Sequence, residues 1–410
     1  MRDSGIEFLG EVPSHWDLQP AVTLARVLTS TVDKKSYEGE QSVKLCNYTD
    51  VYYSDQIVDS SDFTVATATL EQIAKFSVRA GDVPFTKDSE TAADIGIPSY
   101  VPKDLPGTVY GYHLSIFRPI DKRRGRFLKY LLESDYAKAY FEARTPGVTR
   151  VGLGQATIRY FRAPTPPVEE AVAIADYLDR ETAQIDAFIA KNEELITLLT
   201  ERKRAILPRA IDDLTGETIK LRYLYSPSKQ ANYPDETVLS VYREHGVVVK
   251  SSRSDNFNVT PENLDRYLLV RPEDVVVNRM KAWQGSLGVA SMTGIVSGDY
   301  EVLRPRRDAL LPAYANHLLR SPKLIGQYGA RSTGIRPSQW RLYWDQMGDI
   351  RVTVPTRDVQ ERVVREIDER VDTVVRGIQT AERVVSLARE RRAALISAAV
   401  TGKIDMGVAV

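Results

Sequence analysis

The chain has very little cysteine: Cys46 is the single one among 410 residues. One cysteine cannot form an internal disulfide bond, so a disulfide-stabilised fold is excluded. The four histidines lie far apart in the sequence and show no spacing of the His-x-x-x-His kind. Because a zinc site needs several such ligands close together, we expect no structural metal site in this chain.

Long apolar runs are absent as well. No run approaches the roughly 20 residues that a membrane-spanning helix needs. The opening residues, 1–5, lack the basic start and apolar stretch of a secretion signal. The hydrophobic fraction of 43% and the charged fraction of 27% are those of a soluble globular protein. We therefore expect a cytoplasmic protein without membrane contacts, and the length suits two domains.

The chain has no net charge, since 55 basic residues balance 55 acidic ones. This balance counts mildly against simple nucleic-acid binding, for which a basic protein is expected. The charge is nevertheless segregated, because basic residues far outnumber acidic ones in residues 118–162 and again in residues 304–341. Two separate basic stretches leave binding to DNA open.

The sequence contains an internal repeat. Residues 201–207 return as residues 390–396, an offset of 189 positions, and Leu178-Asp179 meets Ile367-Asp368 at the same offset. Shorter motifs between these segments recur with offsets that drift from 192 to 186, which indicates similar scaffolds with loops of different length. These motif pairs are 78–83 with 270–275, 116–119 with 302–305, 131–134 with 318–321, and 143–148 with 330–335.

Both copies of the longer repeat carry apolar residues every seven positions, which is typical of a coiled coil. At about 1.5 Å per residue, each helix would run roughly 60 Å. The predicted coiled-coil core consists of Leu178, Ile185, Asn192, Leu199, Ile206, Ile367, Val374, Ala381, Ala388 and Leu395. A polar residue in such a core sets the register, but Asn192 facing solvent is an equally good interpretation.

The segments between the helices mix short β-rich runs with helical stretches, which predicts α/β or α+β domains. The predicted order is a first globular domain (1–165), a long helix (166–214), a second globular domain (215–354), and a second long helix with the C-terminal tail (355–405). The two helices can pack antiparallel with a pseudo-two-fold axis and hold the domains apart. Two similar modules at a fixed distance are suited to reading two half-sites on one DNA duplex.

Several stretches resemble one known family, the DNA-specificity subunits of type I restriction–modification systems. Residues 4–16 are similar to the characteristic opening of these subunits, and residues 174–186 to their first conserved helix. Residues 47–52 with 81–96 resemble one class of target recognition domain, and residues 278–297 another. The chain departs from the family where a Glu-Gln pair is common near the helix start: it has Glu169-Glu170-Ala171 in the first copy and Val359-Gln360-Glu361 in the second.

The resemblance implies a non-catalytic subunit that binds a bipartite double-stranded DNA target through two target recognition domains. Such a subunit directs adenine methylation or cleavage by its partners. The implied partners are two modification (methyltransferase) subunits, which bind S-adenosylmethionine, and restriction (translocase and endonuclease) subunits, which use ATP and Mg. No cofactor is expected in this chain itself.

Catalytic motifs give no competing interpretation of similar weight. Gly402-Lys403 lacks the upstream glycine of a phosphate-binding loop, and Glu201-Arg202-Lys203 has the shape of a nuclease motif but lies in the heptad helix. The Asn-Pro-Pro-aromatic sequence of adenine methyltransferases is missing. The alternatives are a coiled-coil scaffold protein that does not bind DNA and, less favoured, a stand-alone DNA-modifying enzyme.

Candidate DNA contacts are polar or basic residues beside glycines and turns, because arginine, asparagine and glutamine read base edges and basic residues hold phosphates. The candidates are Lys87, Arg144, Thr149, Arg150, Arg279, Lys281, Gln284, Arg331 and Arg336. For any one arginine, a surface ion pair is an equally good interpretation. For Trp283 and Trp340, a role in the hydrophobic core is the favoured interpretation. Tyr48, Tyr52 and Tyr53 are predicted to lie partly buried in a β-like run.

Overall fold

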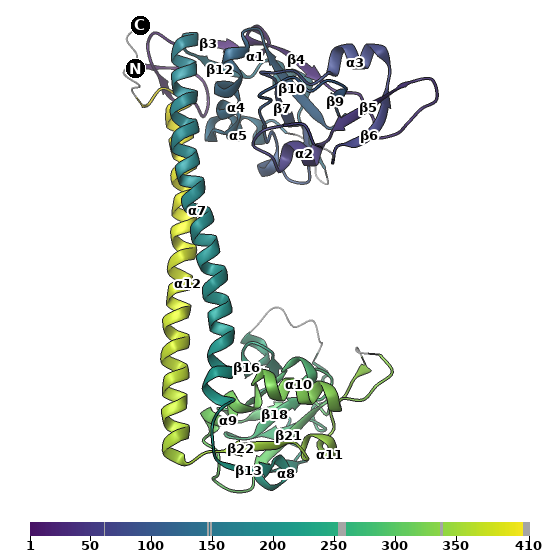
Figure 1. Cartoon of the computed structure of the whole chain (residues 1–410), viewed down its shortest axis with the longest axis vertical. Coiled ribbons are helices and arrows are strands. Elements are labelled where there is room, and N and C mark those ends of the chain that lie inside the picture. Colours follow the sequence, from purple (N-terminus) through teal and green to yellow (C-terminus); the bar gives the residue numbers. More distant parts are fainter. Residues whose placement is uncertain (61, 146, 148–149, 253–259, 337–338, 405–410) are drawn as a thin grey trace. The chain divides into compact units, whose positions relative to one another are not determined.

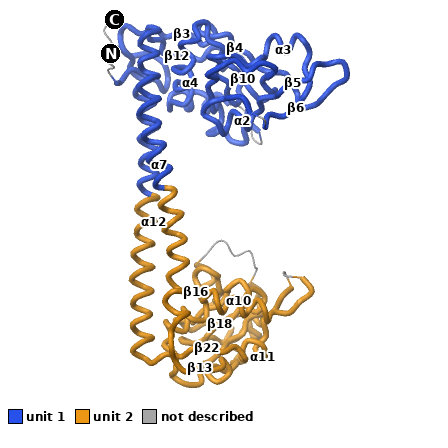
Figure 2. Tube along the Cα trace, in the orientation of Figure 1, with its two compact units in different colours: residues 1–192, 383–410 blue, residues 193–382 orange. Residues whose placement is uncertain are grey.

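A computed structural model of the chain describes residues 1–60, 62–145, 147, 150–252, 260–336 and 339–404 (Figure 1). The chain divides into two compact units (Figure 2). Unit 1 comprises residues 1–192 and 383–410, and unit 2 comprises residues 193–382. Each unit contains one domain of mixed helices and strands together with a segment of each of two long helices. The predicted fold class is confirmed in these respects.

The two long helices are α7 (Val168–Ile211) and α12 (Arg357–Val400), each of 44 residues. Acidic residues in the first turn, among them Glu169 and Glu170 of α7, suit the positive end of the helix dipole. The helices run antiparallel in both units: the Arg392 side chain on α12 binds Asp186 of α7 in unit 1. In unit 2, Gly377 of α12 lies against Leu199 of α7, since a Cβ atom added at Gly377 would be 3.2 Å from the Leu199 side chain.

The predicted coiled-coil positions lie on the less exposed side of these helices. Six of them are buried, namely Leu178, Ile206, Ile367, Val374, Ala381 and Ala388. The other four, Ile185, Asn192, Leu199 and Leu395, are half-buried. The Asn192 amide donates a hydrogen bond to the Phe188 carbonyl one turn earlier, at 2.9 Å. Asn192 therefore uses this donor within its own helix.

The helix α12 ends two residues before a glycine. Gly402 adopts φ +74°, a left-handed conformation that glycine reaches without strain. Its N–H group and that of Lys403 donate to the carbonyls of Ala399 and Ala398, at 3.1 and 2.8 Å. A Cβ atom at Gly402 would lie 2.3 Å from the Pro13 ring. The opening segment of the chain thus packs directly on the end of α12.

Unit 1 opens with a short strand pair, β1 (Arg2–Asp3) with β2 (Glu11–Val12), and its domain is then closed by the antiparallel pair of β3 (Asp17–Pro20) with β12 (Arg162–Thr165). Between them lie a three-stranded sheet in the order β4-β10-β7 and a second in the order β6-β5-β9. The first sheet consists of Ala25–Thr29, Leu114–Pro119 and Val83–Thr86, and the second of Thr64–Ala68, Gln41–Cys46 and Thr108–Tyr110. The α-helices of this domain are α1 (Ala21–Leu24), α2 (Tyr48–Tyr52), α3 (Leu70–Phe76), α4 (Gly125–Glu133), α5 (Asp135–Glu142) and α6 (Gln155–Arg159).

The domain of unit 2 is closed in the same way, by β13 (Glu217–Lys220) with β22 (Arg351–Val354). Its main sheet has the order β14-β21-β18-β19. These strands are Tyr225–Ser228, Tyr300–Pro305, Val275–Asn278 and Leu287–Val289. Two further pairs join β15 (Leu239–Tyr242) to β16 (Gly246–Val249) and β17 (Leu268–Val270) to β20 (Gly294–Val296). The helices are α8 (Leu221–Leu224), α9 (Pro312–Leu319), α10 (Pro322–Arg331) and α11 (Trp344–Met347).

A buried ion pair accounts for two of the short repeated motifs. In unit 1, the Asp82 carboxylate is 1% exposed and binds the guanidinium of Arg118 through two atoms, at 2.8 and 2.7 Å. In unit 2, Asp274 and Arg304 form the equivalent pair at 3.2 and 3.1 Å. Each pair ties the turn before one strand, β7 or β18, to the neighbouring strand, β10 or β21. The repeated motifs therefore recur because both sheets are locked at the same point.

Each domain shares its hydrophobic core with the long helices. In unit 1, Ala171 and Leu178 of α7 and Ile396 of α12 pack in one cluster with the side chains of α4 and α5. In unit 2, Ile206 of α7 and Ile367 of α12 pack with α9, α10 and the main sheet. A domain and its helical segments therefore form one cooperative structure, because neither could leave the other without exposing apolar surface.

Candidate nucleic-acid interface

The first domain has a hollow of about 480 Å³ on its surface. Helix α2 forms one wall, and β8 (Asp88–Ser89) with the short helix η1 (Ala92–Asp94) forms the other. Arg150 lies exposed at its edge. Lys87 precedes β8, and its ammonium group binds the Asp88 carboxylate at 3.2 Å. Of the candidate residues, Arg150 therefore lines the hollow, and Lys87 lies next to it through its bond to Asp88.

Tyrosines line one wall of this hollow. The rings of Tyr48 and Tyr52 stack with their centroids 5.5 Å apart, and Tyr53 is 80% exposed. The Tyr52 hydroxyl donates to the Asp94 carboxylate at 2.8 Å, and this hydrogen bond raises the pKa of Tyr52 to about 12. The phenol is thus fixed as a neutral donor whose aromatic ring remains available for contact.

The prediction of a β-like run at these tyrosines is wrong. They lie in and directly after helix α2, which begins after Asn47 with a capping box. The Asn47 N–H group donates to the Asp50 carboxylate at 2.6 Å. This signal, Asn-x-x-Asp, was present in the sequence and favours a helix start. The β-branched and aromatic residues around it masked the signal.

The imidazole of His113 is a further part of the hollow that the sequence did not indicate. Its Nδ1 lies 2.8 Å from the same Asp88 oxygen that Lys87 binds. The ring of Tyr112 lies beside it, tilted by 40°, with the ring centroids 3.7 Å apart. The hollow therefore combines aromatic faces, cationic donors and carboxylate acceptors, which are the groups that contact bases and phosphates.

The other two candidates of the first domain lie elsewhere. The guanidinium of Arg144 binds the Glu7 carboxylate at 3.0 Å and lies over the ring of Tyr140, 4.2 Å from its centroid. These contacts hold the opening segment of the chain against α5, which is a structural role. Thr149 lies outside the described residues.

In the second domain, two loops form one surface. The first loop follows β18 and holds Arg279, Lys281 and Gln284; the second is closed by a pair of hydrogen bonds between Thr333 and Arg341, at 3.0 and 2.9 Å. The rings of Trp283 and Trp340 join the loops in an edge-to-face contact, with the centroids 5.4 Å apart. The Leu342 N–H group also donates to the Arg279 carbonyl at 2.9 Å.

The charged groups of this surface differ in how firmly they are held. The Arg279 guanidinium donates to the carbonyls of Gly298 and Asp299, so it braces the loop. Arg331 ends α10 and is half-buried, whereas Lys281 and Arg336 are exposed. Lys281 and Arg336 are therefore the two basic side chains best placed to meet a ligand.

The turn that carries Gln284 depends on a glycine. Gly285 adopts φ +90°, and a Cβ atom there would lie 2.8 Å from the Ile325 side chain of α10. The first loop is therefore pressed against α10, and its shape is fixed by the domain core. This close approach explains why a glycine follows Gln284 in the sequence.

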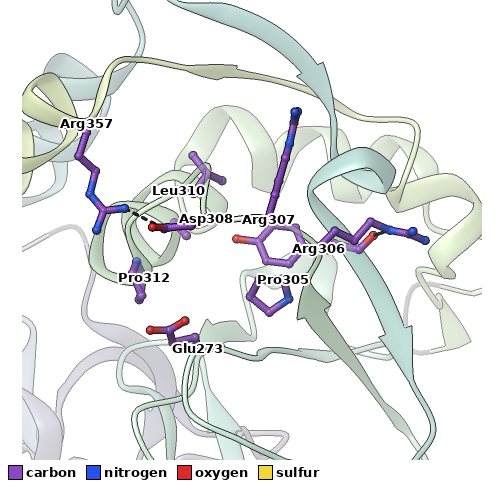
Figure 3. A pocket seen from close by; sticks show the side chains of 10 residues that line it. Glu273, Pro305, Arg306, Arg307, Asp308, Leu310, Pro312 and Arg357 are labelled. Atoms are coloured by element: carbon purple, nitrogen blue, oxygen red, sulfur yellow. Dashed lines mark hydrogen bonds and ion pairs between the residues drawn. The ribbon is translucent and has the colours of Figure 1, made fainter.

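A second hollow, of about 380 Å³, lies where the domain of unit 2 meets the start of α12 (Figure 3). The Arg357 guanidinium binds the Asp308 carboxylate at 2.8 Å, and Arg306 donates to the Tyr225 carbonyl at 3.0 Å. Arg307 extends away from the Arg357–Asp308 pair. Because two of its three arginines are already bound within the protein, this hollow is best understood as a joint between the domain and the helix.

Metal and membrane sites are not evident in the part of the chain that the structure describes. No group of three or more histidine, cysteine or acidic side chains there could hold a metal ion. No helix among the described residues is both long and apolar enough to cross a membrane.

Comparisons with known proteins agree with this architecture. Residues 28–197 match the family described as type I restriction modification DNA specificity domain. The chain is 23% identical over 206 residues to the MjaX type I restriction enzyme specificity subunit of Methanocaldococcus jannaschii, covering 49% of this chain and 46% of that protein. It is 21% identical over 253 residues to the EcoKI specificity subunit of Escherichia coli K12, covering 60% and 52%. The matches thus span about half the length of these relatives.

Two solved structures share the fold along nearly the whole chain. A chain from a study of complex assembly and conformational transition in the type I R-M system superposes with a TM-score of 0.71 at 15% identity, covering 96% of this chain and 100% of that one. The HsdS subunit from Thermoanaerobacter tengcongensis gives 0.59 at 15% identity, covering 96% and 98%. By the family match over residues 28–197, the named relatives and the shared fold, the chain is similar to the specificity subunits of type I restriction–modification systems.

Proposed function

We propose that this chain reads a two-part double-stranded DNA target and directs adenine methylation or cleavage by partner subunits. One observation carries the proposal: two domains locked by the same buried ion pair each present a basic, aromatic surface. Two similar surfaces in one chain suit a target with two half-sites. The relatives are named specificity subunits, so the chemistry is assigned to the partners.

Because the partner subunits carry out the chemistry, the cofactors bind to those subunits. S-adenosylmethionine belongs to two modification subunits, and ATP and Mg belong to restriction subunits. A subunit that acts on the cell's own DNA would work in the cytoplasm.

The two surfaces offer different groups to the bases. In the first domain, carboxylates such as Asp94 are suited to accept from a cytosine amine, while Arg150 suits a phosphate or guanine. In the second domain, Lys281 and Arg336 are the exposed cations and Gln284 is the amide suited to adenine. Different groups on similar scaffolds predict that the two half-sites differ in sequence.

The long helices offer a surface for the modification subunits. A groove of about 410 Å³ in unit 1 runs between α7 and α12 and is lined by Ile185, Phe188, Val384, Leu387 and Ala388 among others. Phe188 is 50% exposed and Leu387 is 56% exposed. Exposed apolar side chains that share one groove favour protein–protein contact over solvent exposure. We therefore propose that a modification subunit covers this groove.

One experiment tests the reading of DNA. The chain is co-expressed with its modification subunits, and methylated adenines are mapped across a DNA library. A sharp two-part motif is expected. The variant Lys281→Ala/Arg336→Ala should lose preference in one half of the motif by about 1–3 kcal/mol per base contact and keep the other half. Methylation without any two-part motif would contradict the proposal.

A second experiment tests the helix surface. The variant Phe188→Glu/Leu387→Glu should lose the modification subunits in a co-purification, because two charges would be buried in the contact. Glu194→Ala, an exposed site on α7, is the matched control and should retain them. A scaffold protein that does not bind DNA would retain neither duplex DNA nor a methyltransferase in either form.

A further inference from the structure

In each unit, a carboxylate at the same place in the helical repeat holds the domain. Asp179 on α7 and Asp368 on α12 are 189 residues apart, which is the offset of that repeat. In unit 1, the Tyr130 hydroxyl donates to Asp179 Oδ1 at 2.7 Å. In unit 2, His317 Nε2 lies 3.3 Å from Asp368 Oδ1.

The partners of these carboxylates are equivalent as well. Tyr130 lies on α4 and His317 on α9, and each directly precedes a repeated Leu-Leu pair. The two contacts therefore join the same point of the domain to the same point of the helix. The side chains differ, but the position of the link is kept in both copies.

The two links differ in strength. Asp179 also accepts a hydrogen bond from the Arg126 guanidinium at 2.6 Å, and Tyr130 is 4% exposed. The position that corresponds to Arg126 in unit 2 is Ala313, which has no donor. The Asp368 side chain is 61% exposed. The Asp179 side chain is 43% exposed, so the two links differ mainly in the number of donors, and two donors hold a carboxylate more firmly than one.

The links supply what the shared cores lack. Apolar packing joins each domain to its helices, but it has no preferred direction. A hydrogen bond to a carboxylate requires both a short distance and an aligned donor. A link of this kind on the flank of a helix therefore limits how far the domain can rotate on the apolar contact.

We propose that Asp179 and Asp368 are positioning residues that fix the direction in which each recognition domain faces from its helices. The proposal rests on the proposed function, since that direction would set how many base pairs are allowed between the two half-sites. The link of unit 2, with its single donor, is the weaker one. Replacing either carboxylate should therefore loosen spacer selection.

The test uses the complex with the modification subunits and duplexes that carry both selected half-sites. The spacer between them varies from two base pairs shorter to two base pairs longer than the preferred length. The variants are Asp368→Ala and Asp179→Ala/Tyr130→Phe, in which the phenol is removed so that no buried hydroxyl is left unpaired. Asp372→Ala, an exposed carboxylate one turn along α12, is the control.

The readout is the ratio of binding to the preferred spacer over binding to its neighbours. In Asp368→Ala this ratio should fall about threefold, within the range that an exposed charged pair contributes. The preferred half-site sequences and the ratio in the control should not change. A purely structural loss would weaken binding to every spacer equally and leave the ratio unchanged.

The failures of the two proposals are distinguishable. If the unaltered protein selects no two-part target, the proposed function fails. If it selects one and both variants keep its spacer ratio, the positioning role is overturned. Altered base preference in Asp368→Ala would also overturn the positioning role, because a residue on the helix would then act on the bases and not on the direction of the domain.

Discussion

Removing the buried carboxylate of unit 1 tests the packing argument most directly. Asp82→Ala leaves the guanidinium of Arg118, whose side chain is 12% exposed, without its counter-ion. It also removes the acceptor of the Tyr110 hydroxyl, at 3.0 Å, and of the Arg79 N–H group, at 3.1 Å. Breaking a buried pair by deleting one partner costs about 3–5 kcal/mol, because the remaining charge stays buried.

The equivalent change in unit 2 should cost less. Asp274→Ala frees Arg304, whose side chain is 29% exposed and can reach water more easily. We expect a loss of about 2–3 kcal/mol, below the range for a fully buried pair. Asp59→Ala is the surface control, since its pair with Lys44 is exposed and worth about 0–1 kcal/mol.

Tryptophan fluorescence during urea unfolding separates the two units. Trp16 belongs to unit 1, whereas Trp283, Trp340 and Trp344 belong to unit 2. Replacing Trp16 by phenylalanine in a parallel series isolates the signal of unit 2. The reasoning is refuted if Asp82→Ala unfolds at the urea concentration of Asp59→Ala, or if Asp274→Ala destabilises its unit more than Asp82→Ala destabilises unit 1.

Two further outcomes follow from single positions. Burial lowers the pKa of His317, with Arg320 acting in the same direction and Asp368 opposing it. The unfolded chain then binds a proton more readily than the folded chain, so unit 2 should lose stability as the pH falls below about 6.5. In urea titrations at several pH values, His317→Gln should weaken this dependence of stability on pH. An unchanged pH dependence in the variant would contradict the prediction. Gly402→Ala should destabilise unit 1 by about 1–3 kcal/mol, because the left-handed backbone disfavours alanine and the added carbon meets Pro13. A melting temperature equal to that of the unaltered chain would argue against this prediction.

The helices could be predicted from the sequence because their signal is redundant. The seven-residue spacing recurs along both helices, so single irregularities such as Asn192 do not hide it. The ends were predictable for the same reason, since acidic first turns and Gly402 act through the local backbone. Local chemistry determines these features, and the sequence displays local chemistry directly.

The recognition surfaces were harder to predict, because they depend on residues far apart in the chain. Arg150 and Asp88 share a hollow only after β8 pairs with β11 (Val151–Gly152), and His113 reaches Asp88 across 25 positions. Arg144 was chosen as a candidate for the same reason as Arg150, as a basic residue near a glycine and a turn, but it binds Glu7. A basic residue beside a glycine therefore does not by itself reveal whether its partner is inside or outside the protein.

The strand pairs β3–β12 and β13–β22 have a consequence for how such a chain can change. They place the first and the last strand of each domain side by side, so that the residues between them start and finish at the same point next to the long helices. A loop among these residues can lengthen or shorten without shifting either helix. This explains why the offsets between the two domains drift while long stretches of the helices keep one period, and it leaves the residues that meet a ligand free to diverge on a frame that does not move.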